Sequence, residues 1–204
     1  MDLFLNIILV AIPSYLIGAI PSSFIMGKVA RGIDLREHGS GNLGAANAFR
    51  VLGTKAALPV LLFDIGKGFV AARFFAGLGG EGFAYTLLAV FAVVLGHNYS
   101  VFVGFSGGKG VGTTTGAFLA LCPHAVAISF FLWLVVLFIF RIVSVASMVG
   151  AVSLPGAILV SNSFFGHGTH PSIVVLSIVA AVMVVYKHRS NIGRLRTGKE
   201  KKIF

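Results

Sequence analysis

The sequence predicts an all-α integral membrane protein with seven transmembrane helices, some of them short, with the N-terminus outside and the C-terminus in the cytoplasm. Three observations lead to this fold class. Apolar residues make up 57% of the chain and charged residues only 11%, against about a quarter in an ordinary soluble domain. Apolar runs of membrane-spanning length recur along the chain, and the cations lie at their ends. At 204 residues we expect one membrane-embedded domain, residues 1–204.

Five apolar runs are direct candidates for transmembrane helices, each of which needs about 20 mostly apolar residues. The first is expected to be retained, because it is too long for a signal-peptide core and follows Asp2 instead of a cation. The five candidates are Leu3–Gly27, Thr54–Gly77, Phe83–Val103, Val143–Ser161 and the short Ser172–Tyr186.

The run Val111–Phe140 has 30 residues, too many for one upright helix and few for two, and Pro123 interrupts it. One span here would divide the cations between both membrane faces. A turn near residues 122–124 gives seven spans and leaves Arg73 as the exception on the outer side. By the positive-inside rule we expect this turn and two short helices. The following cations then share the cytoplasmic side: Lys28, Arg31, Arg36, Arg50, Lys55, Lys109, Arg141 and the basic tail.

The net charge of +10 does not indicate nucleic-acid binding, because the cations flank apolar segments and form no soluble basic face. The lone Cys122 lies in an apolar stretch, so we expect a small buried side chain and no internal disulfide. His167 and His170 are expected to be exposed loop residues, since no Cys or carboxylate lies near them to complete a metal site.

The first polar loop, "GSGNLGAAN" at residues 39–47, has the spelling of a dinucleotide-binding fingerprint. That interpretation fails, because the fingerprint must follow a strand and a transmembrane helix is predicted there. The local chemistry remains that of an anion site, with a helix start near Ala45 aimed at it. A tight interfacial turn with polar caps is the alternative. Glycine N–H groups and polar side chains are the expected donors: Gly39, Gly41, Gly44, Ser40, Asn42 and Asn47.

The second polar loop, "FSGGKGVGT" at residues 105–113, resembles a Walker A motif only in part. Val103 stands where the motif needs its first glycine, and Gly110 where it needs Ser or Thr. Lys109 between glycines, followed by Thr113 at a helix start, is still suited to holding an oxyanion. The alternative is a lysine that only sets topology.

Nearby polar residues have structural explanations as well. His97 and Ser100 in "GHNYS" fall near the cytoplasmic end of the third predicted span, and His97 is more simply a buried histidine bonded to a neighbouring helix. Asp64 and Lys67, three residues apart within one span, are expected to pair on one helix face.

The third polar segment, "KHRSNIGRL" at residues 187–195, follows the last span and carries His188, Arg189, Asn191 and Arg194. A topology signal or a contact with lipid headgroups is the alternative to a binding role. Whether Arg141, Ser144 and Ser147 join the same site is open from the pattern alone. The loops together offer donors and cations with few carboxylates, which favours a site for anions.

"GSGNLGAAN", "GHNYSVFVGFSGGKGVGT" and "KHRSNIGRLRTGKE", in this order between apolar spans, resemble the three motifs of the bacterial acyl-phosphate:glycerol-3-phosphate acyltransferases, the PlsY family. The resemblance covers essentially the whole chain. It implies a multi-pass enzyme of the bacterial inner membrane, with its N-terminus periplasmic. The enzyme would transfer a fatty acyl group from acyl-phosphate to the 1-hydroxyl of glycerol 3-phosphate, giving lysophosphatidic acid and phosphate for phospholipid synthesis.

The resemblance also implies roles for individual residues. Expected catalytic residues are Ser40, Asn42, Lys109 and His188; expected substrate-binding residues are Gly41, Gly44, Asn47, Arg50, Gly107, Gly108, Gly110, Thr113, Arg141, Ser147, Arg189 and Asn191. No histidine is followed by Asp five residues later, so the sequence shows no obvious aspartate-supported histidine base. The general base is therefore His188, His97 or a substrate phosphate oxygen, and the scarcity of carboxylates favours the phosphate.

We expect a monomer that contacts membrane lipid and needs no metal or other cofactor. The basic tail is also a candidate docking segment for a soluble enzyme that produces acyl-phosphate. The main alternative function is an organic-phosphate transporter, which also needs a cationic pocket but requires a polar path across the membrane. A structural lipid-binding subunit is a third class, and it leaves the three donor-rich loops unexplained.

Overall fold

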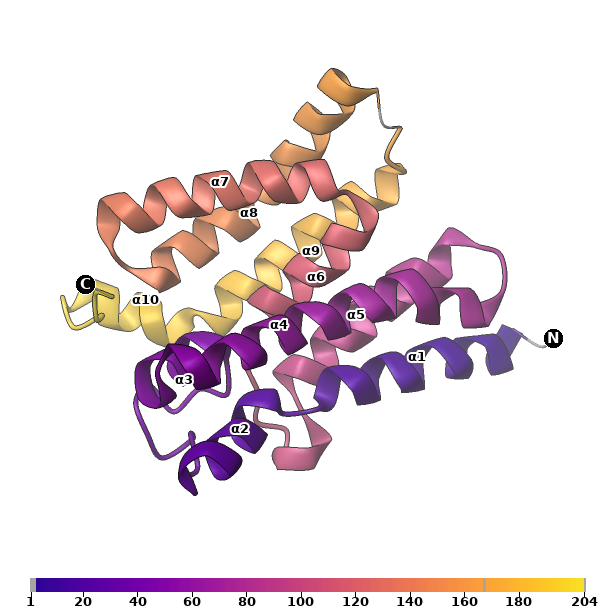
Figure 1. The fold of residues 1–204 in the computed structure, drawn as a ribbon. Coiled ribbons are helices and arrows are strands. Elements are labelled where there is room, and N and C mark those ends of the chain that lie inside the picture. Colours follow the sequence, from indigo (N-terminus) through magenta and orange to yellow (C-terminus); the bar gives the residue numbers. More distant parts are fainter. Residues whose placement is uncertain (1–2, 167, 204) are drawn as a thin grey trace. The chain divides into compact units, whose positions relative to one another are not determined.

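The computed structural model describes residues 3–166 and 168–203, and every regular element in these ranges is helical (Figure 1). Asp2 and His167, which entered the sequence predictions, lie outside them. The chain forms two compact units, unit 1 (Met1–Leu121) and unit 2 (Cys122–Phe204). Four helical segments of the described residues are long and apolar enough to span a membrane, and a bent pair at the C-terminus would be a fifth. The chain is thus all-helical and of membrane type, while the count of seven spans and the orientation remain predictions.

In its described residues, 3–121, unit 1 contains six α-helices, and all three predicted spans within it are helical. Its elements are α1 (Leu3–Ala19), α2 (Ser22–Arg31), α3 (Ala45–Leu52), α4 (Thr54–Val70), a short π-helix (Ala71–Phe75), 3₁₀ turns at Ala76–Gly79 and Val101–Val103, α5 (Phe83–Asn98) and α6 (Val111–Leu121). The predicted single helix Leu3–Gly27 is instead broken between α1 and α2. Pro21 explains the break, because proline lacks an N–H and disfavours helical backbone in the residue before it.

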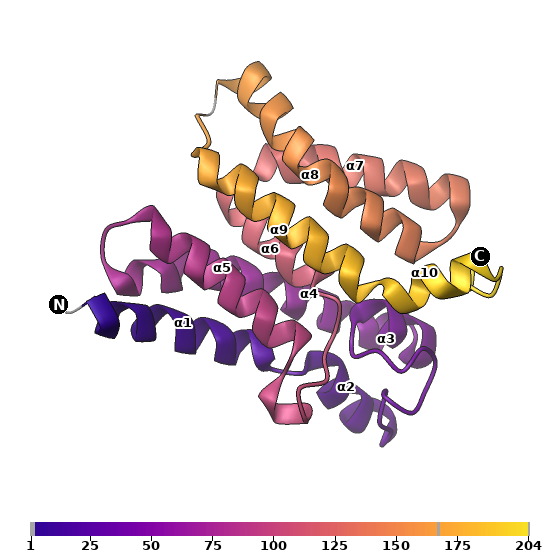
Figure 2. The ribbon, with the colours of Figure 1, turned by 180° about the vertical axis from the view of Figure 1, so that it is seen from behind.

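Small residues let the helices of unit 1 approach closely. Both views show α1 beside α5 (Figures 1 and 2). A Cβ added to Gly18 would lie 2.2 Å from the Val93 carbonyl oxygen, and one added to Gly96 would lie 2.2 Å from that of Tyr15. Close backbone approach through glycine is a common way to pack helices in a membrane, where the hydrophobic effect does not drive helices together.

The break between α1 and α2 leaves carbonyl groups at the end of α1 without intrahelical partners. Lys67 on α4 donates a hydrogen bond of 3.2 Å from Nζ to the Ile20 carbonyl, and Ser100 donates from Oγ to the Ala19 carbonyl. These bonds satisfy groups that would otherwise be costly in a membrane interior. A cation at the C-terminal end of α1 also opposes the negative end of its dipole.

Unit 2 contains α7 (Pro123–Phe140), α8 (Val143–Phe165), α9 (Pro171–Lys187) and α10 (Arg189–Arg196). Since α6 ends at Leu121 and α7 begins at Pro123, the predicted interruption of the run Val111–Phe140 is confirmed. Cys122 lies between them and is buried, as expected. His170 is exposed at the N-cap of α9, where its Nδ1 accepts a hydrogen bond from the Ser172 N–H. The axes of α9 and α10 differ by 54°.

The polar loops of unit 1 lie at one of its ends. Both views place α2, α3 and the loop that precedes α6 at the opposite end of this unit from the start of α1 (Figures 1 and 2). The long helices α4 and α5 reach this end with the start of α4 and the end of α5. Two of the three polar motifs of the sequence therefore meet at one end of unit 1.

Candidate functional site

The first polar loop is held in shape by Asn47, which is almost fully buried. Its Oδ1 accepts a hydrogen bond of 2.8 Å from the Ser40 N–H, and its Nδ2 donates to the carbonyls of Leu35 and His38. Gly39 has φ of +66°, and a Cβ there would lie 2.3 Å from Asn47 Oδ1. Glycine is therefore required at 39 by conformation and by space. Asn47, predicted to bind substrate, directs these bonds to the loop backbone.

Two backbone N–H groups of the glycine loops, of which the sequence suggested that of Gly41 as an anion donor, are used inside the protein. The Gly41 N–H donates to the His38 carbonyl, and the Gly108 N–H donates to the His97 carbonyl, both at 3.1 Å. The expectation that Gly41 exposes its N–H is thus wrong, since the loop must satisfy its own backbone to hold this turn. The first turns of α3 and α6 offer donors instead, because N–H groups at a helix start have no intrahelical partner.

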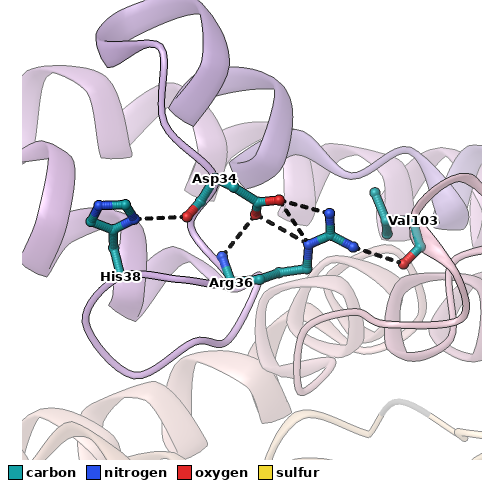
Figure 3. A network of polar contacts seen from close by, with 4 residues as sticks. All are labelled: Asp34, Arg36, His38 and Val103. Carbon is teal, nitrogen blue, oxygen red and sulfur yellow. Dashed lines mark hydrogen bonds and ion pairs between the residues drawn. The ribbon is translucent and has the colours of Figure 1, made fainter.

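An ion pair and hydrogen bonds fix the segment Asp34–His38, which leads into the first loop (Figure 3). Arg36 Nη2 lies 2.6 Å from Asp34 Oδ2, and Arg36 Nη1 donates to the Val103 carbonyl at 3.4 Å. His38 donates from Nδ1 to the Asp34 carbonyl. Figure 3 shows the Arg36 guanidinium between Asp34 and Val103. Hydrogen bonding to Arg36 lowers the pKa of Asp34 to about 2.

The two glycine loops are joined directly. Asn42 donates a hydrogen bond of 3.2 Å from Nδ2 to the Gly107 carbonyl. A Cβ on Gly44 would lie 2.9 Å from Asn42 Oδ1 and 4.0 Å from the Gly108 Cα. The predicted residues Asn42, Gly44, Gly107 and Gly108 therefore lie together, and they bring the start of α3 towards the segment that leads into α6.

Around this junction the predicted side chains differ in exposure. Ser40 and Arg50 are exposed, and Lys109 is half-buried. Thr113 is fully buried, and its Oγ1 makes no hydrogen bond within the described part of the chain. A buried hydroxyl without a partner is unusual, so Thr113 is suited to meeting a polar group near the start of α6. Gly110, just before α6, has φ of +80°.

In unit 2, the Glu200 carboxylate accepts hydrogen bonds from two residues of the third motif and from one residue of α8. Its Oε1 accepts hydrogen bonds from Ser144 Oγ at 2.7 Å and from Asn191 Nδ2, and its Oε2 accepts from Arg194 Nε at 2.6 Å. Burial opposes ionisation, but these three donors outweigh it and lower the pKa of Glu200. The Ile203 N–H also donates to the Arg141 carbonyl. The basic tail is thereby folded back onto the start of α8.

His188 is buried at the junction of α9 and α10, and its Nδ1 lies 2.7 Å from the Val184 carbonyl. A carbonyl only accepts hydrogen bonds, so Nδ1 carries a proton and Nε2 is the basic atom of the neutral ring. Asn191, also buried, is one turn away on α10. The Arg189 guanidinium lies 4.8 Å from the centre of the Tyr186 ring. Ser147 Oγ accepts a hydrogen bond from Trp133 Nε1.

The predicted pair Asp64–Lys67 is confirmed, with 2.9 Å between Lys67 Nζ and Asp64 Oδ1. His97 is buried, as the structural interpretation expected. Asp64 Oδ1 also lies 3.6 Å from His97 Nδ1, so a carboxylate stands beside this histidine although no histidine is followed by Asp five residues later. No sequence spacing marks this contact, which the packing of α4 and α5 creates. The only available signal was that a carboxylate inside a span needs partners.

Comparison with known proteins adds to this geometry. The sequence profile of the glycerol-3-phosphate acyltransferase family matches residues 8–198. A protein of Chlorobaculum tepidum named glycerol-3-phosphate acyltransferase is 41% identical over 226 residues, covering 98% of this chain and 96% of that protein. A protein of Alkaliphilus metalliredigens with the same name is 42% identical, covering 96% of this chain and 95% of that protein.

Two crystal structures of PlsY (YgiH), described as an integral membrane glycerol 3-phosphate acyltransferase, resemble this chain. The glycerol 3-phosphate form has a TM-score of 0.84 and 36% identity, covering 97% of this chain and 96% of that one. The lysophosphatidic acid form has a TM-score of 0.82 and 34% identity, covering 99% and 95%. Profile, sequence and structure agree over nearly the full length, and the chain belongs to the glycerol-3-phosphate acyltransferase family of integral membrane proteins.

Proposed function

We propose that this chain transfers a fatty acyl group from an acyl-phosphate to the 1-hydroxyl of glycerol 3-phosphate, at the cytoplasmic face of the bacterial inner membrane. The products are lysophosphatidic acid and inorganic phosphate. Family membership supports glycerol 3-phosphate as the acceptor. The related PlsY structures are described as glycerol 3-phosphate and lysophosphatidic acid forms, which are the acceptor and the product of this transfer.

The observation that carries the proposal is the hydrogen bond from Asn42 to the Gly107 carbonyl. Because of this bond, the starts of α3 and α6 belong to one assembly with Lys109. Helix N-termini favour anions through their unpaired N–H groups and their dipoles. Lys109, which directly precedes Gly110 and the start of α6, adds a full positive charge. This combination is suited to a phosphate group and to the oxyanion that develops on the acyl carbon.

In the proposed reaction, the 1-hydroxyl oxygen of glycerol 3-phosphate bonds to the acyl carbon. The bond from that carbon to the phosphate oxygen breaks, and phosphate leaves with the electron pair. Lys109 and the side chains of Ser40 and Asn42 stabilise the negative charge on the carbonyl oxygen in the transition state. The hydroxyl proton passes to a substrate phosphate oxygen.

In unit 2, His188 and Asn191 are the residues proposed to bind glycerol 3-phosphate. The Nδ1–H of His188 is held by the Val184 carbonyl, which fixes the ring. Asn191 is fixed by Glu200. Fixed groups that hold both substrates convert a bimolecular reaction into an effectively unimolecular one. Acyl-phosphate already carries a good leaving group, so positioning and charge stabilisation supply most of the acceleration.

The test is phosphate release by purified protein in lipid, supplied with palmitoyl-phosphate and glycerol 3-phosphate and without added metal, CoA or carrier protein. We expect release only with both substrates, and lysophosphatidic acid by mass spectrometry. Lys109→Ala should collapse the rate. Lys55→Ala is the matched control, since Lys55 is an exposed lysine at the start of α4 outside the proposed site. Folded wild type that releases no phosphate would contradict the proposal, and glycerol 3-phosphate uptake into proteoliposomes would then test the transporter alternative.

A further inference from the structure

A buried polar cluster links α2, α4 and α5 in unit 1. Asp64 Oδ1 accepts a hydrogen bond of 2.8 Å from Ser22 Oγ and lies 2.9 Å from Lys67 Nζ. The exposed fractions of Asp64 and Lys67 are only 2% and 3%. Lys67 also donates to the Ile20 carbonyl, so the break between α1 and α2 explains its position. Asp64 is then needed beside Lys67, because an unpaired buried cation is costly.

His97 is a third neighbour of the same carboxylate oxygen. Its Nδ1 lies 3.6 Å from Asp64 Oδ1, which is too long for a hydrogen bond but close enough for attraction in an apolar interior. Lys67 already balances the charge of Asp64, so charge balance gives no reason for a histidine here. The opposite edge of the imidazole ring, which carries Nε2, does give a reason for a histidine at this position.

That edge faces the second glycine loop. A Cβ on Gly108 would lie 2.0 Å from His97 Nε2, and a Cβ on Gly107 would lie 2.2 Å from the His97 carbonyl oxygen. The same carbonyl accepts the hydrogen bond from the Gly108 N–H. Both the ring and the backbone of His97 therefore touch the two glycines that precede Lys109, and Gly107 is the residue to which Asn42 bonds.

We propose that His97 is a positioning residue for the loop Gly107–Gly110, with Asp64 orienting one edge of its ring and the other edge setting where Gly108 and Lys109 lie. The ligand positioned in this way is a substrate phosphate group. The inference rests on the proposed function, which assigns phosphate binding to this loop. Because the positioned ligand is a bound phosphate group, a displaced loop is expected to bind it more weakly and so to raise the KM of that substrate.

Two substitutions separate the edges of the ring. His97→Asn keeps an amide near the Nδ1 position and leaves nothing at Nε2, whereas His97→Gln carries its amide to about the Nε2 position. We expect His97→Asn to raise the KM of either acyl-phosphate or glycerol 3-phosphate by about tenfold. His97→Gln should raise the same KM by roughly threefold or less, since only His97→Asn loses the contact that aligns the loop. His170→Asn is the control, because asparagine keeps an acceptor at the N-cap of α9.

A third variant tests the link through the carboxylate. Asp64→Asn keeps an oxygen for Ser22 and removes the charge that faces His97. We expect it to raise the same KM, and the double variant Asp64→Asn/His97→Asn to be no worse than the more affected single variant, since residues acting through one another are not additive. Thermal unfolding of each variant and kinetics per folded molecule separate this effect from lost stability.

Two results would overturn the proposal. One is an equal fall in kcat for His97→Asn and His97→Gln with KM unchanged for both substrates. The other is a lower unfolding temperature with normal kinetics of the folded fraction, which would make His97 merely structural. Failure of the proposed function looks different, since the wild type itself would then transfer no acyl group. Binding of inorganic phosphate by calorimetry still tests the positioning in that case, with about tenfold weaker binding by His97→Asn than by wild type expected and equal binding contradicting it.

Discussion

The side-chain amide of Asn42 donates a hydrogen bond to the carbonyl of Gly107, across 65 positions of the chain. The bond joins two loops that carry most of the predicted site residues of unit 1. Both loops are rich in glycine, so little else in their side chains can hold them together. Together with the bond from Arg36 to the Val103 carbonyl, this amide helps to set their relative position.

Asn42→Ala is expected to lower kcat/KM for phosphate release by about 100-fold, because the loops lose their alignment. The stability loss should be only about 1 kcal/mol, the usual net value of one hydrogen bond. Steady-state kinetics and thermal unfolding check the two parts. Asn6→Ala is a matched control, since it removes an amide bond to Tyr85 in the same unit. Equal activity of the two variants would contradict a role for Asn42 in the site.

The helices were largely predictable from the lengths of the apolar runs. The interruption of Val111–Phe140 followed from charge balance and Pro123, and the helix start at Ala45 followed from the glycine loop before it. The break after α1 was missed although Pro21 marks it, because the run Leu3–Gly27 is apolar on both sides. Hydropathy indicates which segments lie in lipid. It does not indicate that a helix can break inside such a segment when a lysine of another helix, here Lys67, donates a hydrogen bond to the freed carbonyl of Ile20.

The site was predictable as a set of residue types and not as a set of contacts. Gly39 and Gly41 do adopt left-handed backbone, as a glycine loop suggests. Which N–H groups remain for a ligand depends on how the loop closes, and here the Ser40 and Gly41 N–H groups are used internally. Contacts between distant segments, such as Asp64 with His97, leave no periodicity in the sequence.

Gly108→Ala should be severely damaging, because its Cβ would lie 2.0 Å from His97 Nε2 and one of the two must move. We expect kcat/KM to fall by about 100-fold, in line with the cost of displacing an aligned loop. Gly112→Ala is the matched control. Its Cβ would make an ordinary contact of 3.4 Å with the Asp64 Cβ, and alanine is about 0.5–1 kcal/mol more favourable than glycine within a helix. Similar kinetics of the two alanine variants would show that the Gly108 position is not constrained.

The pair Asp34–Arg36 predicts a pH-dependent part of stability. The pKa of Asp34 falls from 3.8 to about 2 because Arg36 hydrogen-bonds its charged form. A lowered pKa in the folded state stabilises the protein above the ordinary pKa of the group, and this stabilisation is lost as pH falls through the folded value. The difference in unfolding temperature between wild type and Asp34→Asn should thus be constant above about pH 5 and shrink between about pH 4 and pH 2.

Thermal unfolding in detergent across this pH range measures that difference. Glu37→Gln is the control, since it removes a carboxylate of the same loop and leaves the Asp34–Arg36 pair in place. A difference between wild type and Asp34→Asn that stays constant down to about pH 2 would show that the pair does not stabilise the folded state.

Glu200 should couple the tail of unit 2 to the predicted glycerol 3-phosphate residues, since it accepts hydrogen bonds from Ser144, Asn191 and Arg194. Glu200→Gln keeps an oxygen for Ser144 and Asn191 but loses the ion pair with Arg194. Glu200→Ala loses all three contacts and removes this acceptor from the buried side chains of Ser144 and Asn191, where a donor left unsatisfied costs about 1–3 kcal/mol. We expect the alanine variant to be clearly less stable than the glutamine variant and to show the larger rise in KM for glycerol 3-phosphate, because Asn191 is no longer held. Limited proteolysis of the tail and steady-state kinetics measure the two effects. A tail cleaved faster in Glu200→Ala with an unchanged KM would mean that Asn191 does not depend on Glu200 for its role.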